Sequence, residues 1–403
     1  MNLDLTREKR IFLVDGLINI SAAQIYVFLQ KIILKNNEFE IFFISATDKK
    51  MSWPYSQVPQ NLIRLWENGK FVRKLFTFFK LKKPSIIHFF FELRTFGSLK
   101  SALKLPLLLF LLKTLNTKIV LTMYNPFILR KENRWQIVDQ TTIKFIPLFI
   151  MKVLIHLYVK SICRFSHRII VENKIVKSGL EEYFDVSSEK INVINNAVPQ
   201  EIGLISNIKR KEFLNKFSNK KIILCFGVIS PRKGQSNAIK AFKIIEDKLP
   251  DHILVIGGRL SPEFQLYKKE LLDLINEFNL EKKVFYLEEL DEEEINLLFE
   301  ISDIALFPYH PAIYGSGAFS FALQYNKPSI VTSIDTFKEI LGDDGGVFVD
   351  PKNDEQLAQA IIDLLTDPKL RNDTINKMKA TSELRSCESI AQKHYEIYKQ
   401  ILK

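Results

Sequence analysis

Short apolar runs alternate with amphipathic stretches along nearly the whole 403-residue chain. In the first half, runs of strand length predict strands at 10–14, 40–45, 85–90, 118–123, 168–172 and 191–194. In the second half, similar runs predict strands at 221–226, 252–256, 283–287, 303–307, 328–332 and 346–349. Apolar residues at helical spacing lie between these runs, for example in 21–35 and 174–184. Such alternation predicts parallel sheets built from βαβ units.

The two series of strands predict two similar doubly wound α/β domains. A polar, lysine-rich segment, 197–220, separates the series and is typical of a linker with a short helix. The chain is also long for a single hydrophobic core. We therefore expect one domain over 1–200 and a second over 201–380. Ligands of such sheets bind outside the carboxyl ends of the strands, so a cleft between facing strand ends is the expected site.

The most apolar tracts do not predict a membrane span. The tract 105–112 is too short to cross a bilayer, and 145–159 is interrupted by a lysine and a histidine. The first residues lack the pattern of a signal peptide. The three cysteines, Cys163, Cys225 and Cys387, are too far apart and too few for a disulfide framework. These features favour a reduced, cytoplasmic setting.

The net charge of +11 is unevenly distributed. Residues 1–200 hold 30 of the 57 basic and 15 of the 46 acidic residues, so the cationic character belongs to the first half. This asymmetry predicts an anionic surface or acceptor facing the first domain. Residues 70–83 mix phenylalanines with six cations at a spacing that suits a basic amphipathic helix. Such a helix either lies on an anionic membrane or packs its phenylalanines on the sheet. Known nucleic-acid recognition motifs are absent, so no nucleic-acid partner is expected.

The stretch 222–235, "IILCFGVISPRKGQ", turns from a predicted buried strand into a predicted helix. Backbone N–H groups at a helix N-terminus lack internal partners and carry partial positive charge. Arg232 and Lys233 add two cations, while Gly227 and Gly234 allow close approach of the backbone. The turn therefore suits a phosphate. The alternative is a solvated basic loop before a helix.

The segment 226–258 closely resembles the phosphate-binding segment of glycosyltransferase family 4, the retaining nucleotide-sugar transferases of GT-B fold. The resemblance continues through 303–317, 326–332, 335–340 and 345–350, ends in the closing helix 386–402, and includes 168–198 upstream. It covers the C-terminal half well and the first 160 residues weakly. It implies a GT-B fold, with two Rossmann-like doubly wound domains facing each other across a cleft.

The resemblance implies a glycosyltransferase of the hexosyltransferase class. The domain 201–380 would bind a nucleotide-sugar donor, and the domain 1–200 would bind a glycan or lipid-linked acceptor. The segment 381–403 would form a helix that packs back on the first domain. Cell-surface polysaccharide or glycolipid synthesis is the expected process, in the cytoplasm or at the inner face of an anionic membrane. No cofactor is expected, and no metal, because the sequence has no Asp-x-Asp, HExxH or Cys/His cluster.

The resemblance also implies roles for individual residues. Where the family often has Gly-Arg, this chain has Gly227-Val228, and Arg232 is expected to supply the charge. The positions of two family glutamates are Ile313 and Phe321 here, and the chain instead resembles the branch with a "PY…SG" segment. The residues expected in catalysis are Lys233, Arg232 and Tyr124. Those expected at the donor are Gly227, Ser230, Gly234, Tyr309, Ser316, Gly317, Ala318 and Glu339. Those expected on the acceptor side are His88, Glu92 and Asn125.

Two other functions stay open at the level of sequence. The missing glutamates, and Tyr124 in place of a frequent family histidine, would suit a non-catalytic GT-B homologue that binds a nucleotide sugar or glycan. A GT-B phosphorylase or epimerase would bind phosphate or a nucleotide as its tight ligand instead. For His88, Glu92 and Glu339, purely structural roles are the alternatives.

Overall fold

The computed structural model divides the chain into two compact units, which are described separately. The first unit comprises Met1–Ala197 and Cys387–Lys403, and the second comprises Val198–Ser386. The structure describes residues 9–15, 20–36, 38–47, 61–67, 70–92, 96, 99–124, 146–198, 206–217, 220–260, 264–310, 316–343 and 345–403.

The first unit contains a seven-stranded parallel sheet in the order β3-β2-β1-β4-β5-β6-β7. Its strands are β1 (Arg10–Val14), β2 (Glu40–Ala46), β3 (Leu62–Trp66), β4 (Ile86–Phe91), β5 (Lys118–Met123), β6 (Arg168–Val171) and β7 (Ile191–Val193). Six of these confirm the predicted strands, and β3 was missed. The missed strand is a short edge strand with an exposed arginine, Arg64, and only one buried side chain, that of Trp66. Its apolar run is short and is interrupted by the charged Arg64.

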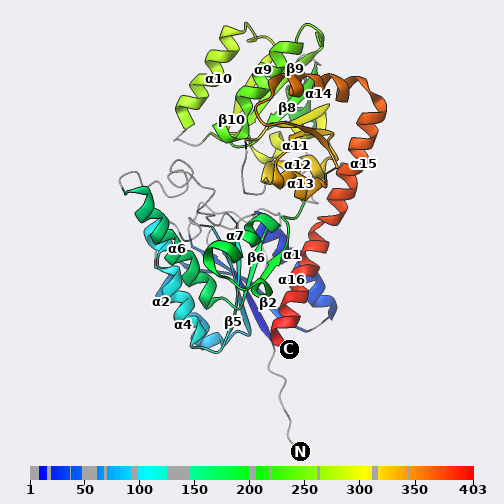
Figure 1. The fold of residues 1–403 in the computed structure, drawn as a ribbon. Helices are drawn as coiled ribbons and strands as arrows, with labels where there is room; N and C mark the ends of the chain where they lie inside the picture. The colour runs from blue at the N-terminus through cyan, green and yellow to red at the C-terminus, as the bar shows by residue number, and fades with distance from the viewer. Residues whose placement is uncertain are drawn as a thin grey trace, which may run out of the picture. The chain divides into compact units, whose positions relative to one another are not determined.

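Helices cover both faces of this sheet (Figure 1). They are α1 (Ile20–Asn36), α2 (Phe71–Lys82), α3 (Leu99–Ala102), α4 (Leu105–Lys113), α6 (Leu148–Phe165), α7 (Lys174–Phe184) and α16 (Cys387–Leu402), with a 3-10 turn, η1, at Ser188–Lys190. The C-terminal helix α16 packs beside α1 and buries Ile390 and Tyr398 in a cluster with strand residues. On the other face, the ring of Phe79 in α2 lies 5.6 Å from that of Phe12 in β1.

The second unit contains a six-stranded parallel sheet in the order β10-β9-β8-β11-β12-β13. Its strands are β8 (Lys221–Phe226), β9 (His252–Gly258), β10 (Val284–Glu288), β11 (Ile304–Phe307), β12 (Ser329–Thr332) and β13 (Val347–Val349). All six lie where the apolar runs predict them, with ends shifted by at most two residues. The two sheets confirm the predicted fold class of two Rossmann-like parallel-sheet domains.

The helices of the second unit also lie on both faces of its sheet. They are α8 (Asn207–Lys216), α9 (Gln235–Ile245), α10 (Gln265–Glu277), α11 (Glu292–Ile301), α12 (Gly317–Gln324), α13 (Asp335–Leu341), α14 (Asp354–Thr366) and α15 (Pro368–Leu384), with a 3-10 turn, η2, at Pro231–Lys233. One core cluster joins α9, α10 and α14 to the sheet. The opposite cluster includes α11 and α12. The central strands, buried on both faces, hold their carboxyl ends in fixed positions.

Candidate functional site

The turn after β8 lies at the point where the strand order of the second sheet reverses. β8 pairs with β9 on one side and with β11 on the other, all in parallel. The chain leaves β8 at Phe226, forms the 3-10 turn η2 and enters α9 at Gln235. Ligands of open α/β sheets bind at such a reversal, outside the carboxyl ends of the strands. The residues 227–235 thus occupy the position in which a ligand site is expected.

The ends of β8 and β9 approach each other so closely that glycine is required. The N–H of Gly227 donates to the carbonyl of Gly257 at 3.0 Å. Gly258 has φ +152°, and a Cβ built on it would lie 1.8 Å from the carbonyl oxygen of Gly227. Side chains are therefore absent at this edge, which leaves the backbone open to close approach by a ligand.

Gly234 presses the turn against the end of β11. Its φ of +67° is left-handed, and a Cβ there would lie 1.9 Å from the carbonyl oxygen of Pro308. The N–H of His310 donates to the carbonyl of Arg232 at 2.9 Å, which ties the segment after β11 to the same turn. The positions of the two cations are therefore fixed by two neighbouring strand ends.

Lys233 lies over an aromatic ring. Its Nζ is 3.6 Å from the ring centroid of Tyr309, a cation–π contact. Burial, and secondly the nearby charge of Arg232, lower the pKa of Lys233 to about 7. Among the described residues no carboxylate forms an ion pair with this ammonium, and an incoming anion would stabilise its charge.

Tyr309 connects the turn to the start of α12. Its hydroxyl lies 2.7 Å from Oγ of Ser316, and that Oγ accepts the N–H of Phe319 at 3.1 Å as the helix cap. A Cβ built on Gly227 would lie 3.6 Å from the Tyr309 hydroxyl and 3.7 Å from Cβ of Ala318. These distances place Gly227, Lys233, Tyr309, Ser316 and Ala318 in one cluster, as the resemblance to family 4 implied.

Three polar side-chain atoms of the turn are buried without a hydrogen-bond partner among the described residues: Ser230 Oγ, Arg232 Nε and Gln235 Oε1. Buried polar groups in folded proteins are nearly always paired, by protein, water or ligand. Three such atoms within six residues of one turn therefore indicate a place where a polar ligand or water belongs.

The backbone amides of the turn contribute less than the sequence predicted. The N–H of Lys233 donates to Ser230, that of Gly234 to Pro231, and that of Ser236 to the hydroxyl of Tyr267. The tight η2 turn satisfies the first two donors, and Tyr267 of α10 satisfies the third, so the expectation that these N–H groups near Gly234 are free is corrected. The side chains carry more of the anion-binding capacity.

Sequence reasoning missed a chain of hydrogen bonds that braces the turn. Nε2 of His310 lies 2.8 Å from Oδ1 of Asn237, whose Nδ2 donates to Oδ1 of Asp354 at 2.6 Å. The chain joins the segment after β11, the first turn of α9 and the start of α14. The three residues lie far apart in the sequence, so no local pattern could reveal them.

Gly317 and Glu339 were both predicted at the donor, and both are at least partly exposed. Gly317 is exposed, and nothing lies within 4 Å of a Cβ built on it. Glu339 lies within α13 and is partly exposed. Its predicted contact with a sugar stays a prediction.

The sequence indicated that His88 lies at a strand end, and this prediction is wrong. It lies inside β4, is 0% exposed, and uses both ring nitrogens. Nδ1 is 2.6 Å from the hydroxyl of Tyr398 and Nε2 is 2.7 Å from Oγ1 of Thr122. Burial, and then the neighbouring His394, lower its pKa well below the usual value. The strand continues to Phe91, so the histidine joins α16 to the sheet and is not available to an acceptor.

Tyr124, predicted in catalysis, and Glu92, predicted on the acceptor side, follow the carboxyl ends of β5 and β4. Tyr124 directly follows β5, is 9% exposed, and has a buried hydroxyl with no hydrogen-bond partner among the described residues. Burial, and then the negative charges of Asp15, Glu172 and Glu92, raise its pKa well above the usual value. Glu92 is partly exposed at the end of β4. Asn125 lies outside the described residues.

The described part of the chain contains neither a metal-binding cluster nor a membrane-spanning helix. Within it, no group of three or more His, Cys, Asp or Glu side chains could hold a metal ion. None of its helices combines the length and apolar character that crossing a membrane requires.

Comparison with known sequences gives a family match in the second unit. Residues 206–381 match the family described as Glycosyl transferases group 1. The chain is 24% identical to the O-antigen chain mannosyltransferase RfbU of Salmonella typhimurium, over 62% of this chain and 66% of that protein. It is 27% identical to an uncharacterized glycosyltransferase of Methanocaldococcus jannaschii, over 58% of this chain and 60% of that protein. The matched part thus spans about two thirds or less of these relatives.

A third similar protein is a bacterial N-acetylgalactosaminyltransferase. It is the N-acetylgalactosamine-N,N'-diacetylbacillosaminyl-diphospho-undecaprenol 4-alpha-N-acetylgalactosaminyltransferase of Campylobacter jejuni, 28% identical over 51% of this chain and 54% of that protein.

Solved structures match over nearly the whole chain. A glycosyltransferase from Rickettsia africae has a TM-score of 0.72 at 19% identity, covering 98% of this chain and 99% of that chain. HepE of Anabaena, solved in complex with UDP and glucose, has a TM-score of 0.72 at 17% identity, covering 98% of this chain and 100% of that chain. At these identities the likeness establishes the fold, and it does so for both units.

Proposed function

We propose that this chain, which belongs to the GT-B glycosyltransferases, transfers a sugar from a nucleoside diphosphate donor to a glycan or lipid-linked acceptor, with retention of the anomeric configuration. The observation that carries the proposal is the turn after β8. It gathers two cations and three buried polar atoms without partners among the described residues, at the reversal point of the sheet. That combination suits a diphosphate.

The chemistry proposed for the turn is stabilisation of the leaving group. When the bond between the anomeric carbon and the diphosphate oxygen breaks, its electron pair stays on the diphosphate and an oxocarbenium-like centre forms on the sugar. Lys233 and Arg232 would stabilise the growing negative charge from fixed positions. Preorganised donors of this kind are effective because they need no reorganisation during the reaction. The proposal gives this neutralising role to cations of the protein.

Three observations support a nucleotide-sugar donor and a glycan acceptor. The solved structure of HepE contains UDP and glucose. The name of RfbU describes a mannosyltransferase of O-antigen chains, and that of the Campylobacter relative contains a diphospho-undecaprenol group. The excess of basic residues in the first half would attract an anionic, membrane-held acceptor. We accordingly propose action in polysaccharide or glycolipid synthesis at the cytoplasmic face of a membrane.

A panel of UDP-, GDP- and ADP-sugars tests the proposal at two levels. In thermal-shift measurements, one nucleotide should raise the midpoint of unfolding at millimolar concentration, because a ligand that binds only the folded state stabilises it. NMR of a reaction with that donor should then show release of the nucleoside diphosphate and a product, or slowly hydrolysed sugar, with retained configuration. Binding without release would favour the non-catalytic homologue. If no member of the panel binds, the proposed function is wrong.

A further inference from the structure

The first unit presents three neighbouring helices, α2, α4 and α6, that carry no acidic residue. α2 lies beside α4, and α4 lies beside α6 (Figure 1). The segments 70–83, 99–114 and 148–165 contain six, three and three Lys or Arg residues and no Asp or Glu. A solvated helix surface normally mixes both signs of charge. The single sign over three adjacent helices indicates an anionic partner.

The same helices also expose large apolar side chains. On α4, Leu107 is 54% and Phe110 is 50% exposed. On α6, Val153 is 55% and Leu157 is 59% exposed, and Leu81 on α2 is 77% exposed. Rings of Phe110 and Phe165 lie 5.6 Å apart, so the exposed side chains of α4 and α6 are close neighbours. Scattered exposed apolar residues are ordinary, whereas a group on adjacent helices marks an interaction surface.

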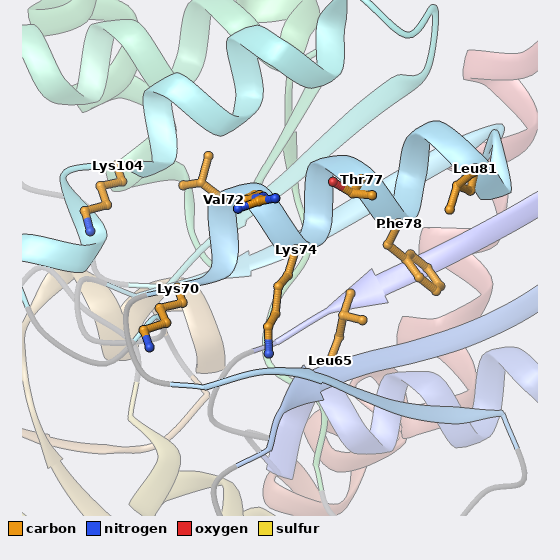
Figure 2. A pocket seen from close by; sticks show the side chains of 9 residues that line it. Leu65, Lys70, Val72, Lys74, Thr77, Phe78, Leu81 and Lys104 are labelled. Atoms are coloured by element: carbon orange, nitrogen blue, oxygen red, sulfur yellow. The ribbon is translucent and has the colours of Figure 1, made fainter.

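A groove along α2 adds cations beside this apolar surface. Its volume is about 800 Å³, and it is lined by Leu65, Lys70, Val72, Arg73, Lys74, Thr77, Phe78, Leu81 and Lys104. Figure 2 shows Lys70 and Lys74 extending from the beginning of α2 to the same side as Leu65. Among the described residues, the lining combines four cations with apolar side chains and contains no carboxylate. An amphiphile with an anionic head group fits that chemistry.

The buried residues of α2 separate its two faces. Phe71, Leu75 and Phe79 are buried against the sheet, as one of the two interpretations of 70–83 had it. Arg73, Lys74 and Lys80 are exposed on the other side. The cations are therefore not needed for packing, and they remain available to a partner.

We propose that the surface formed by α2, α4 and α6, here called the basic helical face, docks on an anionic lipid bilayer. Leu107, Phe110 and Leu157 would insert among the lipids, while cations of α2 would contact phosphate head groups. The inference builds on the membrane-held acceptor of the proposed function, but docking itself requires neither donor nor transfer.

A second copy of the chain is a poorer partner for this face. A symmetric dimer places the same surface on both sides of the interface. Two faces with only positive charge would repel each other, whereas a bilayer that contains anionic lipid complements both the charge and the apolar side chains.

Sedimentation of the full chain with lipid vesicles tests the inference. Binding should be strong to vesicles of phosphatidylcholine with about 30% phosphatidylglycerol, and weak to phosphatidylcholine alone. Raising NaCl from 0.1 M to 0.5 M should weaken binding, because salt screens the attraction. The double variants Leu107→Ser/Phe110→Ser and Lys74→Glu/Lys80→Glu should each reduce the partition coefficient at least about tenfold. All four positions are exposed, so folding should be preserved.

Matched variants of the second unit serve as controls. Leu266→Ser removes an 84% exposed leucine of α10, and Lys211→Glu/Lys369→Glu reverses two exposed lysines. These variants should bind vesicles like the wild-type chain. The inference is overturned if the wild-type chain does not bind anionic vesicles. It is also overturned if both double variants of the first unit bind like the wild type, or if the controls lose binding to the same extent. A dimer in light scattering that Leu107→Ser/Phe110→Ser dissociates, without vesicle binding, would also overturn it. Failure here leaves the thermal-shift result, and hence the proposed transfer, unaffected.

Discussion

Lys233 rests on the face of Tyr309, 3.6 Å from the ring centroid, and its ordinary preference for the charged form is weakened there. The ring attracts the ammonium, while burial and Arg232 oppose its charge and bring the pKa to about 7. A diphosphate beside Lys233 would reverse this balance, because an opposite charge at short distance favours the ammonium. Donor binding should therefore be coupled to uptake of a proton by a single side chain.

This coupling predicts a pH-dependent affinity. A nucleotide sugar has no phosphate monoester that titrates near pH 6, so the change reports on the protein. Below pH 7, Lys233 is already charged in the free chain, and the affinity should level off. Above pH 7, binding must also protonate the lysine, and the affinity should fall about fifteenfold between pH 7 and 8.5.

Isothermal titration at several pH values, in buffers of different ionisation enthalpy, measures both the affinity and the proton uptake. Lys233→Arg is the matched variant, because arginine stays charged throughout this range. It should bind with little pH dependence. A wild-type affinity that stays constant from pH 6 to 8.5 would contradict the coupling.

At the scale of elements, the strands were predictable and their side-chain environments were not. Long apolar runs located β8, β9 and β11, because strands buried on both faces need continuous apolar side chains. β3 was missed because it is a short edge strand, interrupted by the exposed Arg64, in which only Trp66 is buried. His88 was misplaced for a related reason. The sequence does not show whether the histidine of an apolar run is buried or reaches a ligand. The partner that buries it, Tyr398, lies 310 positions later in the chain.

The candidate site shows the same division. The turn 227–235 was predictable from glycines and cations at the end of an apolar run. The cation–π contact of Lys233 and the bracing by His310, Asn237 and Asp354 depend on tertiary structure. The internal satisfaction of the turn's N–H groups was also unpredictable, because it follows from the 3-10 geometry of η2.

The contact between η2 and the end of β11 predicts a large effect at Gly234. Gly234→Ala would impose a left-handed conformation on alanine and place its Cβ against the carbonyl of Pro308. The free energy of unfolding should fall by about 2–4 kcal/mol, since both the backbone and the packing are strained. Urea denaturation measures this change.

Gly317→Ala is the matched control for stability, because nothing lies within 4 Å of the added Cβ. Its free energy of unfolding should stay within about 0.5 kcal/mol of the wild type. Equal stability of the two variants would show that the turn does not press on β11 as described.

At the scale of the whole molecule, the two units differ in charge as well as in sequence similarity. The family match lies within the second unit, and the acid-free basic helical face belongs to the first. The proposed function assigns the donor to the second unit and the acceptor to the first. The fold of both units could be predicted from the alternation of apolar runs. The chemistry of the first unit could not, because residues 1–200 carry no comparable motif.

The central claim is that the turn after β8 binds the diphosphate of a nucleotide sugar. Calorimetric titration at pH 6.5, with the donor that the panel selects, tests it most directly. Lys233→Met keeps most of the length of the side chain and removes its charge, while Lys240→Met makes the same change at an exposed position of α9. We predict that Lys233→Met weakens donor binding at least tenfold and lowers turnover about 10²–10³-fold, whereas Lys240→Met behaves like the wild type. Wild-type affinity and turnover in Lys233→Met would contradict the claim.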